Sequence, residues 1–475
     1  MKLSQLKEKA ESLVQGVVVD LNAPLANEVS FNPDSPTQLS QLLFGGTMKE
    51  TISEPVLNED GTPVIFKSGQ HVGEIKFKKV TRDYEYKGLG LKPLPAWETK
   101  KKGIYSTNEE VLKTIAKRSD HIAGKIADKI LKIRELRKQI STYYDSTEEL
   151  IYEEDSCVHA QFSHCGYGDG TGGGTDTGRL SCTKPNIQNQ PKGFESDVKH
   201  HFMSRYPGGK IIEADFHQIE IAVQAQLSGD KKYIADVING VDFHIKRLAM
   251  KEGGSYAFAL NKIKHEEDPE WIEKRSKIKA FSFARAYGAG AEKISHQTGL
   301  SVEEIKILIQ NEDLEYAELA RYNQKLKEMV EYTARTEGAN KMGYYKSPFG
   351  RRYYFLAENA PEWLRRKGVE KTFSPTKMKN YMIQGTATAD IVLMMIGKFW
   401  REAIKHRDKF LIINTVHDSI ILDCKKEYVN ECKDLIQATM GFESIKEVIK
   451  QNFNYDWIVP IKIDVKVGNS WKECA

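Results

Sequence analysis

The sequence has few cysteines, no apolar segment at its N-terminus and no long apolar run. Six cysteines among 475 residues, none of them in a CxxC pair, are too few for a disulfide scaffold and are typical of a reducing compartment. The apolar run at 391–396 has six residues, whereas a membrane-spanning helix needs about 18. Neither sign of charge predominates over the whole sequence, which has 70 Lys and Arg against 66 Asp and Glu. These absences exclude secreted disulfide-rich and membrane-spanning proteins, and they predict a cytoplasmic location.

Positive charge nevertheless gathers near the N-terminus. Residues 76–102 contain nine Lys or Arg and three Asp or Glu. Such a run is either a solvated face or a surface for a phosphate backbone, and the sequence leaves both open. Residues 51–98 carry scattered Gly and Pro, and we expect a small irregular insertion there. Ser106 and Glu109 have the spacing of a helix capping box, and we expect a long helical stretch from there to about Tyr143.

Three stretches have the composition of β-strands. Residues 210–215 and 412–422 are rich in β-branched side chains, and residues 461–467 alternate between apolar and charged positions without error. Residues 231–365 are mostly helical in pattern, and Ser301–Glu304 has the spacing of another capping box. The mixture predicts an α+β fold.

Asp215 and Asp418 lie at the ends of apolar β-type segments. An aspartate at such a place is costly to desolvate, so it caps a turn, pairs with a base or binds a cation. Each alone is most simply a turn or cap carboxylate. If the two segments lie side by side in one sheet, the pair could hold two Mg²⁺ ions about 3.5–4 Å apart, which would activate a hydroxyl and neutralise a leaving pyrophosphate.

Arg275, Lys279, Phe283 and Tyr287 recur every four residues. At about 100° per residue the four drift by only about 40° per step, so they share one face of a helix. An aromatic core stripe with snorkelling basic side chains would give the same spacing. The functional alternative is a triphosphate clamp, in which the cations bind phosphates and the rings stack beside base and sugar.

These segments resemble motifs of the family A DNA polymerases, the bacterial DNA polymerase I type. Residues 215–220 (DFHQIE) resemble motif A, residues 275–288 resemble motif B on the O helix of the fingers, and residues 416–418 (VHD) resemble motif C. The resemblance runs from about residue 25 to the C-terminus. Further stretches agree in the same order, at 177–181, 185–189, 242–244 and 384–387.

The resemblance implies a right-hand polymerase with an antiparallel-sheet palm, helical fingers and a helical thumb. Its function would be template-directed addition of dNMP to a primer 3′-hydroxyl in DNA replication. The implied domains are a thumb at 1–150 with the insertion at about 51–98, a first palm part at 151–230, fingers at 231–365 and a second palm part at 366–475.

The resemblance also implies a role for individual residues. Asp215 and Asp418 would bind two Mg²⁺ ions, which Mn²⁺ could replace, and Lys279 would be the third catalytic residue. Glu220 would be a steric gate that excludes ribonucleotides, supported by Tyr287. The nucleotide would also contact Arg275, Lys279, Phe283, Tyr287, Gln218 and His244.

Other positions are expected to contact the primer–template near its terminus, mostly in the minor groove, where acceptors are common to every correct pair. These positions are Arg179, Asn186, Gln188, Asn380, Gln384 and His417.

Several positions depart from the family pattern. Ser419 stands where Glu is usual, which removes an accessory carboxylate from the expected site. The remaining departures are Ala222 for Arg, Ser282 for Asn, Ala284 for Gly and His217 for Ser. Because none of them touches the expected catalytic residues, we expect activity to survive, and fidelity, processivity or rate to change.

The thumb pattern begins almost at the first residue, so we expect neither an exonuclease domain nor 3′–5′ proofreading in this chain. The expected partners are primer–template DNA and dNTPs, together with a separate exonuclease or processivity factor, and no membrane. Such an arrangement would suit a split phage replicase working at the nucleoid of a bacterial or infected host cell.

Two other functions stay open at this stage. A single-subunit RNA polymerase shares the palm carboxylates and the O-helix Lys and Tyr, but Glu220 argues against its ribonucleotide substrate. A catalytically silent clamp would only bind duplex junctions, and the presence of both aspartates and both clamp cations argues against it.

Overall fold

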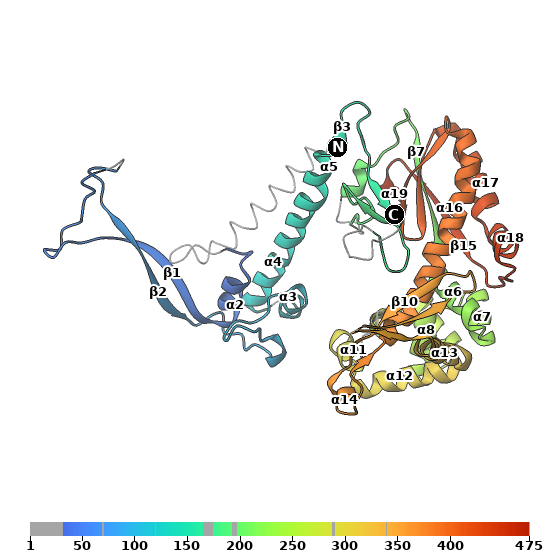
Figure 1. Cartoon of the computed structure of the whole chain (residues 1–475), viewed down its shortest axis with the longest axis horizontal. Coiled ribbons are helices and arrows are strands. Elements are labelled where there is room, and N and C mark those ends of the chain that lie inside the picture. Colours follow the sequence, from blue (N-terminus) through green and yellow to red (C-terminus); the bar gives the residue numbers. More distant parts are fainter. Residues whose placement is uncertain are drawn as a thin grey trace. The chain divides into compact units, whose positions relative to one another are not determined.

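The computed structural model describes residues 32–68, 71–118, 120–164, 174–191, 197–286, 290–338 and 340–474 (Figure 1). The chain forms two compact units, Met1–Ile151 and Tyr152–Ala475. The finer division into thumb, palm and fingers stays a prediction. In the described part of the chain, no helix combines the length and the apolar character that crossing a bilayer requires.

The first unit packs three helices around one apolar cluster. Leu39, Leu112 and Ile130 are among its fully buried side chains. A π-helical turn and a last short helix follow. The elements are α2 (Pro36–Phe44), η2 (Pro95–Trp97), α3 (Glu109–Ala116), α4 (Ile122–Lys138), η3 (Gln139–Asp145) and α5 (Ser146–Glu148).

The predicted helical stretch to about Tyr143 is present but is divided into α3 and α4, and the predicted capping box of Ser106 and Glu109 is wrong. Asn108 caps α3, since its side-chain oxygen accepts the N–H of Val111 at 2.9 Å. His121 then caps the start of α4. Two short amphipathic helices can turn their apolar faces toward each other, which one continuous helix cannot do.

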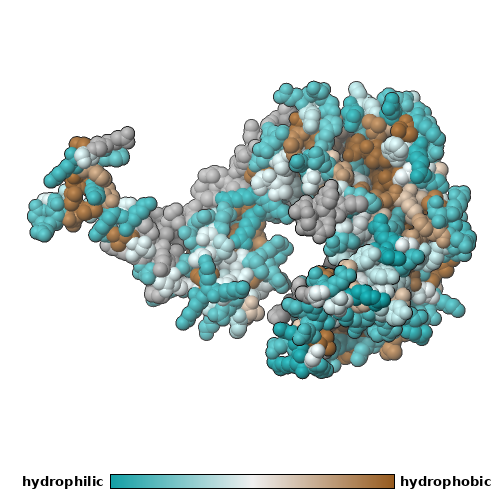
Figure 2. Space-filling view, in the orientation of Figure 1, coloured by the Kyte–Doolittle hydropathy of each residue, from teal (hydrophilic) through white to brown (hydrophobic). Residues whose placement is uncertain are grey.

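The predicted irregular insertion is in large part a regular two-stranded antiparallel ribbon. β1 (Gly46–Pro55) and β2 (Phe77–Tyr86) pair along their whole length, and Glu54 lies opposite Lys78. Opposite charges across a strand pair favour such a ribbon. Figure 2 shows apolar side chains on the outer part of this segment, where Leu57 and Val72 are each more than half exposed.

The second unit is built on a four-stranded antiparallel sheet with the strand order β13-β14-β7-β15. The strands predicted near 210–215, 412–422 and 461–467 all belong to this sheet, so the expected antiparallel sheet is confirmed. Its strands are β7 (Lys210–His217), β13 (Phe410–Val416), β14 (Ser419–Cys424) and β15 (Lys462–Gly468).

The two faces of this sheet differ in what covers them. One face, with Ile212 and Phe216 of β7, packs on three long helices of the C-terminal part (Figure 1). The alternate residues Ile211 and Asp215 lie on the opposite face, where Trp471 packs on Ile211. The covering helices are α16 (Leu393–Ala403), α17 (Val429–Met440) and α18 (Phe442–Phe453) on the first face and α19 (Trp471–Cys474) on the second.

The region predicted as mostly helical also contains a small sheet. Ser301 and Glu304 form the expected capping box of α12. Residues 335–356 form a three-stranded antiparallel sheet that the sequence did not predict. The elements are α6 (Ile219–Ser228), α7 (Lys231–Ile238), α8 (Phe243–Glu252), α9 (Tyr256–Lys264), α10 (Pro269–Ala286), α11 (Ala291–Thr298), α12 (Val302–Glu315), α13 (Ala317–Thr333), β8 (Arg335–Glu337), β9 (Asn340–Lys346) and β10 (Arg352–Leu356).

A helical segment interrupted by a π-helical turn leads back to the main sheet, through α15 (Pro375–Gln384), η5 (Gly385–Val392) and α16. Short elements complete the described chain. They are β3 (Ile151–Tyr152), β4 (Cys157–Val158), β5 (Gln161–Ser163), β6 (Ser181–Thr183), η4 (Val198–His201), β11 (Glu358–Asn359), α14 (Glu362–Arg365), β12 (Lys371–Thr372), η6 (Ile404–His406) and η7 (Lys426–Tyr428).

Candidate active site

Adjacent strands bring Asp215 and Asp418 to the same end of the sheet. Asp215 lies opposite Ser419, the residue that follows Asp418. The backbone N–H of Phe216 donates a hydrogen bond to the Asp418 carbonyl at 3.1 Å. Opposite and diagonal neighbours on paired strands have their Cβ atoms about 4.5–8 Å apart. The two acids are therefore close enough to share bound cations.

A tight turn between β13 and β14 positions Asp418. Val416 pairs with Ser419, which leaves His417 and Asp418 as a two-residue loop. His417 has a φ of 56°, a left-handed conformation that costs a non-glycine residue energy and often occurs at functional sites. His417 is exposed and Asp418 is half-buried at the tip of this hairpin.

Glu220 lies in the first turn of α6, directly after β7. Gln218 makes the change of direction with a φ of 51°, and its side chain is exposed. Glu220 Oε1 accepts a hydrogen bond from Arg179 Nη2 at 2.7 Å. Arg179 Nε also donates to Thr388 Oγ1 at 2.9 Å. Arg179, which the resemblance assigned to DNA, thus holds Glu220 in this structure.

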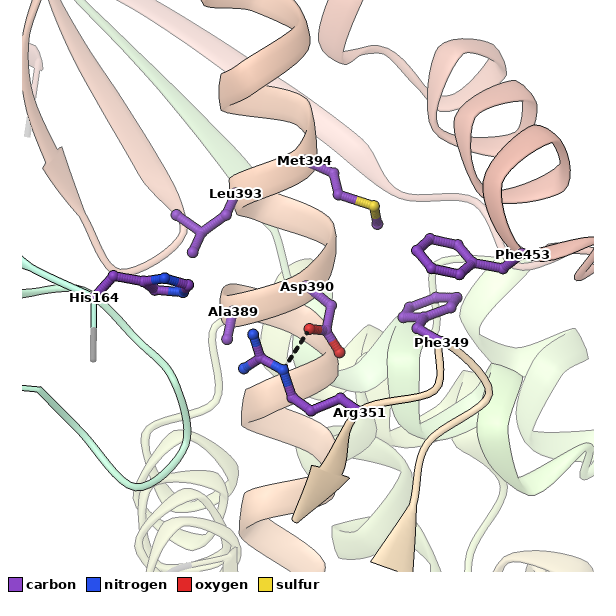
Figure 3. A pocket seen from close by; sticks show the side chains of 8 residues that line it. All are labelled: His164, Phe349, Arg351, Ala389, Asp390, Leu393, Met394 and Phe453. Carbon is purple, nitrogen blue, oxygen red and sulfur yellow. Dashed lines mark ion pairs between the residues drawn. The ribbon is translucent and has the colours of Figure 1, made fainter. Parts of the chain in front are cut away.

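A close approach between two segments positions Arg179. The preceding residue, Gly178, has a φ of 79°, and a Cβ there would lie 2.1 Å from Arg351 Nη1. Arg351 forms an ion pair with Asp390 at 3.0 Å (Figure 3). Burial raises the pKa of Asp390, and the Arg351 charge opposes that rise.

The ion pair between Arg351 and Asp390 lines a cavity of about 580 Å³ (Figure 3). No residue predicted to act in catalysis lines it, among those that the structure describes. We therefore assign no catalytic role to this cavity. Its lining residues are His164, Phe349, Arg351, Ala389, Asp390, Leu393, Met394 and Phe453.

Arg275 on α10 is tied to the start of α8. Its Nη2 donates to Asp242 Oδ2 at 2.6 Å, and Asp242 caps α8 by accepting the N–H groups of His244 and Ile245. Burial acts to raise the pKa of Asp242, but the hydrogen bonds from Arg275 and the Ile245 N–H outweigh it and lower that pKa. Asp242 is therefore ionised, and it offsets part of the positive charge of Arg275.

His244 faces Ser282 of α10. Its Nδ1 lies 3.1 Å from Ser282 Oγ, and Arg247 Nη1 donates to the same oxygen at 3.0 Å. Burial and the neighbouring Arg247 charge lower the pKa of His244 to about 4, so its imidazole is neutral near pH 7. Ser282, one of the departures from the family pattern, thus links α8 to α10.

The predicted cationic face can be followed over only part of α10. Lys279 lies one turn after Arg275 and is exposed. Phe283 belongs to the same helix, but its side chain lies outside the described residues, as does all of Tyr287. The helix packs with its neighbours into an apolar cluster distinct from that of the main sheet.

Asn186, Gln188 and His417, all expected to contact DNA, come close in the fold. The Asn186 side chain accepts the N–H of Gln188 at 3.1 Å and so forms a local turn. Gln188 Nε2 donates to the carbonyl of Thr415 at 2.8 Å. Gln188 is thereby tied to β13 two residues before His417.

Asn380 and Gln384 come from a different element. They lie four residues apart on α15, so they share one face of it, and both are half-buried. The Gln384 carbonyl accepts a hydrogen bond from Thr388 Oγ1, the same hydroxyl that accepts from Arg179. The helix thus connects these two side chains to Arg179.

Two further acids share a sheet face with Asp215 and were not predicted as site residues. Asp464 lies opposite Asp215 on β15, and Glu213 lies two residues before it on β7. Burial raises the pKa of Glu213, and the Lys199 charge opposes that rise. The two-residue period identifies both positions, because it places polar side chains on one face of an otherwise apolar strand.

The donor atoms at this end of the sheet suit a hard divalent cation. Asp215 and Asp418 offer only oxygen ligands, which Mg²⁺ prefers. The carboxylate of Glu213 lies further along the same face, where Trp471 and Ser419 hydrogen-bond it. Within the ranges that the structure describes, no three His, Cys, Asp or Glu side chains form a complete metal site. The set therefore fits a cation that keeps several waters and takes further oxygens from its substrate.

Sequence comparisons match residues 50–473 to DNA polymerase family A. The chain is 26% identical over 426 residues to DNA polymerase I of Chloroflexus aurantiacus, covering 89% of this chain and 39% of that protein. It is 28% identical over 382 residues to the thermostable DNA polymerase I of Thermus aquaticus, covering 80% of this chain and 39% of that protein. The chain thus spans about two fifths of the length of these relatives.

The fold is similar to that of the POL domain of Pol1 from M. smegmatis, solved in complex with DNA primer-template and dNTP. The TM-score is 0.67 at 20% sequence identity, and the match covers 99% of this chain and 66% of that chain. This likeness confirms the expected right-hand polymerase fold. The relatives named here are bacterial, so the expected phage source finds no support among them. Because the family match includes most of the sequence, this chain belongs to DNA polymerase family A.

Proposed function

We propose that this chain is a DNA-dependent DNA polymerase that transfers dNMP from a dNTP to the 3′-hydroxyl of a template-paired primer. One observation carries the proposal, namely that a family A chain has Asp215 on β7 and Asp418 in the turn that leads into the neighbouring β14, at the same end of its sheet. The M. smegmatis relative was solved with DNA primer-template and dNTP, which supports the same ligands for this chain.

Asp215 and Asp418 would hold Mg²⁺, which the family generally uses, or Mn²⁺ in its place. When bound, two such ions lower the pKa of the primer hydroxyl and offset the charge of the leaving pyrophosphate. The strand that carries Asp215 is hydrogen-bonded on both sides, to β14 and β15. Such support limits the movement of its carboxylate during the reaction.

The triphosphate would bind along α10. Lys279 is exposed and would meet a phosphate directly. Arg275 would exchange its bond to Asp242 for a phosphate oxygen, so its contribution depends on the strength of that pair. His244 and Gln218 would border the same nucleotide, with Phe283 at the sugar and Tyr287 at the base, as the resemblance implies.

Glu220 would exclude ribonucleotides. Its carboxylate, held by Arg179 at 2.7 Å, would occupy the space that a ribose 2′-hydroxyl needs. A fixed carboxylate discriminates better than a mobile one, because it cannot move aside for the hydroxyl. The primer–template would be contacted by Arg179, Asn186, Gln188, Asn380, Gln384 and His417.

Primer extension tests this proposal. Asp215→Asn and Asp418→Asn should each lower the extension rate at least about 100-fold, while primer–template binding measured by fluorescence anisotropy stays within a few-fold. The control Asp464→Asn removes an equally negative side chain from β15, on the side of β7 away from Asp418, and should extend nearly as well as the wild type.

Three results would reject the proposal. Preferred extension with ribonucleotides would identify an RNA polymerase. A wild-type chain that binds primer–template but never extends it with Mg²⁺ or Mn²⁺ would be a silent clamp. Equal losses in Asp464→Asn and Asp215→Asn would show that the two predicted acids have no special role.

A further inference from the structure

The ion pair between Arg179 and Glu220 does not make the Glu220 carboxylate rigid by itself. The two side chains are 25% and 44% exposed, and Arg179 Nη2 lies 2.7 Å from Glu220 Oε1. An ion pair exposed to this degree contributes little free energy and does not hold two long side chains in one geometry. The rigidity that a steric gate needs must therefore come from the groups that hold the rest of Arg179.

One of these groups is the hydroxyl of Thr388, which is almost fully buried. Thr388 is 2% exposed and lies in η5, the π-helical turn between α15 and α16. Its Oγ1 accepts a hydrogen bond from Arg179 Nε at 2.9 Å and donates one to the Gln384 carbonyl at 2.7 Å. Turns of π-helix within longer helical segments are frequent at functional sites.

The chemistry of the three groups fixes the direction of both hydrogen bonds. The Nε–H of an arginine can only donate, a carbonyl can only accept, and a hydroxyl has a single proton. Thr388 therefore gives its proton to Gln384 and presents a lone pair to Arg179. Because the hydroxyl donates and accepts at the same time, each bond strengthens the other.

The backbone of Arg179 is held as well. Thr175 Oγ1 donates a hydrogen bond to the Arg179 carbonyl at 3.0 Å, and the preceding Gly178 lies against the guanidinium of Arg351. The guanidinium of Arg179 is planar and rigid, so fixing its Nε and its backbone also fixes the place of Nη2. Nη2 is the atom that binds Glu220, and in this arrangement Nη1 would meet the primer.

We propose that Thr388 is a positioning residue for sugar selection. Its hydroxyl orients the guanidinium of Arg179, which in turn holds the Glu220 carboxylate where a ribose 2′-hydroxyl would lie. The proposal rests on the proposed polymerase function and on Glu220 as its gate. Thr388 does not touch the nucleotide in this account and acts only through Arg179.

A competing explanation is that the Thr388 hydroxyl serves only the fold. Without it, Arg179 Nε would lose an acceptor and the Gln384 carbonyl would lose a donor, which costs stability whatever happens at Glu220. The two explanations differ in sugar selection, because a purely structural hydroxyl would affect the Tm and leave the choice between dNTP and rNTP unaltered.

Thr388→Val tests the proposal, because it keeps the branched shape and removes the hydroxyl. The ratio of kcat/KM for a dNTP to kcat/KM for the matching rNTP measures sugar selection. We expect this ratio to fall about tenfold, as loss of one hydrogen bond to a charged group predicts, mainly through faster use of the rNTP. Thr388→Ser keeps a hydroxyl and should stay within about threefold of the wild-type ratio.

Thr439→Val is the matched control. Thr439 is 4% exposed, and its Oγ1 donates to the carbonyl of Leu435, four residues earlier on α17, at 2.6 Å. The variant therefore removes a buried hydroxyl with the same local hydrogen bond as Thr388, from a helix that covers the main sheet. Whatever its effect on the Tm, it should leave the sugar ratio unchanged.

A double variant tests whether Thr388 acts through Glu220. Glu220→Ala removes the carboxylate and should lower the sugar ratio by itself. Adding Thr388→Val to Glu220→Ala should lower the ratio no further, because no carboxylate is left to be held in place.

The proposal is wrong if Thr388→Val keeps the wild-type ratio while Glu220→Ala lowers it, or if Thr439→Val lowers it as much as Thr388→Val does. It is also wrong if the losses of the two single variants add up in Glu220→Ala/Thr388→Val. If Glu220→Ala itself leaves the ratio unchanged, the gate fails and the role of Thr388 fails with it. Primer extension by the wild type with dNTPs would still report the polymerase activity separately.

Discussion

At the scale of single residues, Gly178 determines where Arg179 lies. Its φ of 79° favours glycine, and the guanidinium of Arg351 fills the space of a Cβ. Arg351 cannot easily give way, because it is paired with Asp390. One small residue thereby connects the ion pair of Figure 3 with the side chain that holds Glu220.

Gly178→Ala should therefore destabilise the chain more than an ordinary glycine substitution. Backbone strain at positive φ costs about 1 kcal/mol, and displacement of Arg351 should raise the total to about 2–3 kcal/mol. The matched control is Gly253→Ala, which has a φ of 69° and nothing within 4 Å of the added Cβ. Thermal unfolding of both variants measures the difference, and equal losses would show that Arg351 moves freely.

At the scale of elements, α8 and α10 are joined by polar contacts as well as by their apolar cluster. Asp242 binds Arg275, and Ser282 accepts from Arg247 and lies beside His244. A serine at 282 is short enough to leave room for both partners. Ser282 therefore contributes to the polar contacts between α8 and α10.

The neutral His244 predicts a pH-dependent stability. Its pKa is about 4 in the folded chain, below the usual value of about 6.5. Between these values the unfolded chain binds the proton more readily, so the free energy of unfolding falls as the pH falls from 6.5 toward 4. After allowance for partial exposure of the imidazole, we expect a loss of about 1 kcal/mol.

His244→Gln should remove this part of the pH dependence. The Tm of the wild type should fall more than that of the variant between pH 7 and pH 5, because only the wild type has an imidazole to protonate at this position. Other groups titrate in both proteins and cancel in the comparison. An identical fall in both would contradict the assignment.

Elements with a clear local signal were predictable from the sequence. The alternation of β15 and the capping box at Ser301 depend on neighbouring residues, and both predictions are confirmed. The break between α3 and α4 was missed, because it depends on packing between two helices and on a cap by Asn108. The β1–β2 ribbon was missed because its strands carry charges on a solvated surface, where apolar alternation is weak.

In the candidate site, too, features with a local sequence signal were predictable and long-range contacts were not. Asp215 and Asp418 could be proposed because one ends an apolar strand and the other lies at the bend of an apolar hairpin, and their proximity follows from the sheet register. The pair of Glu220 with Arg179 joins residues 41 positions apart, and that of Arg351 with Asp390 is also long-range. No local sequence pattern predicts such pairs, so they are found only in the folded structure.

At the scale of the whole molecule, the basic run at 76–102 separates into two kinds of surface. Lys78 and Lys79 belong to the ribbon, where Glu54 lies opposite Lys78. Lys101 and Lys102 lie in an exposed turn after η2 instead. When a protein binds DNA, each lysine that neutralises a phosphate releases counterions. A lysine opposite an acid on the neighbouring strand neutralises a phosphate less fully, so it releases fewer of them.

The salt dependence of DNA binding should distinguish the two surfaces. Lys101→Ala/Lys102→Ala should lower the slope of log K against log salt by up to about 1.8, which is about 0.9 for each lost phosphate contact. Lys78→Ala, which removes the lysine opposite Glu54, should change the slope much less than either single variant Lys101→Ala or Lys102→Ala. Anisotropy titrations of a primer–template at several salt concentrations provide the measurement, and unchanged slopes in all of these variants would reject a phosphate surface here.

The ribbon also has a practical consequence for handling the protein. Gly61 lies in the segment between β1 and β2, with a φ of 83° and nothing within 4 Å of an added Cβ. The β1–β2 ladder lies outside this segment, and an insertion there would interrupt a local turn in which the Gly61 N–H donates to the Asn58 carbonyl at 3.0 Å. A short affinity tag or fluorescent reporter spliced in at Gly61 should therefore leave the ladder intact, which offers a handle for tethering the enzyme to a surface in single-molecule work.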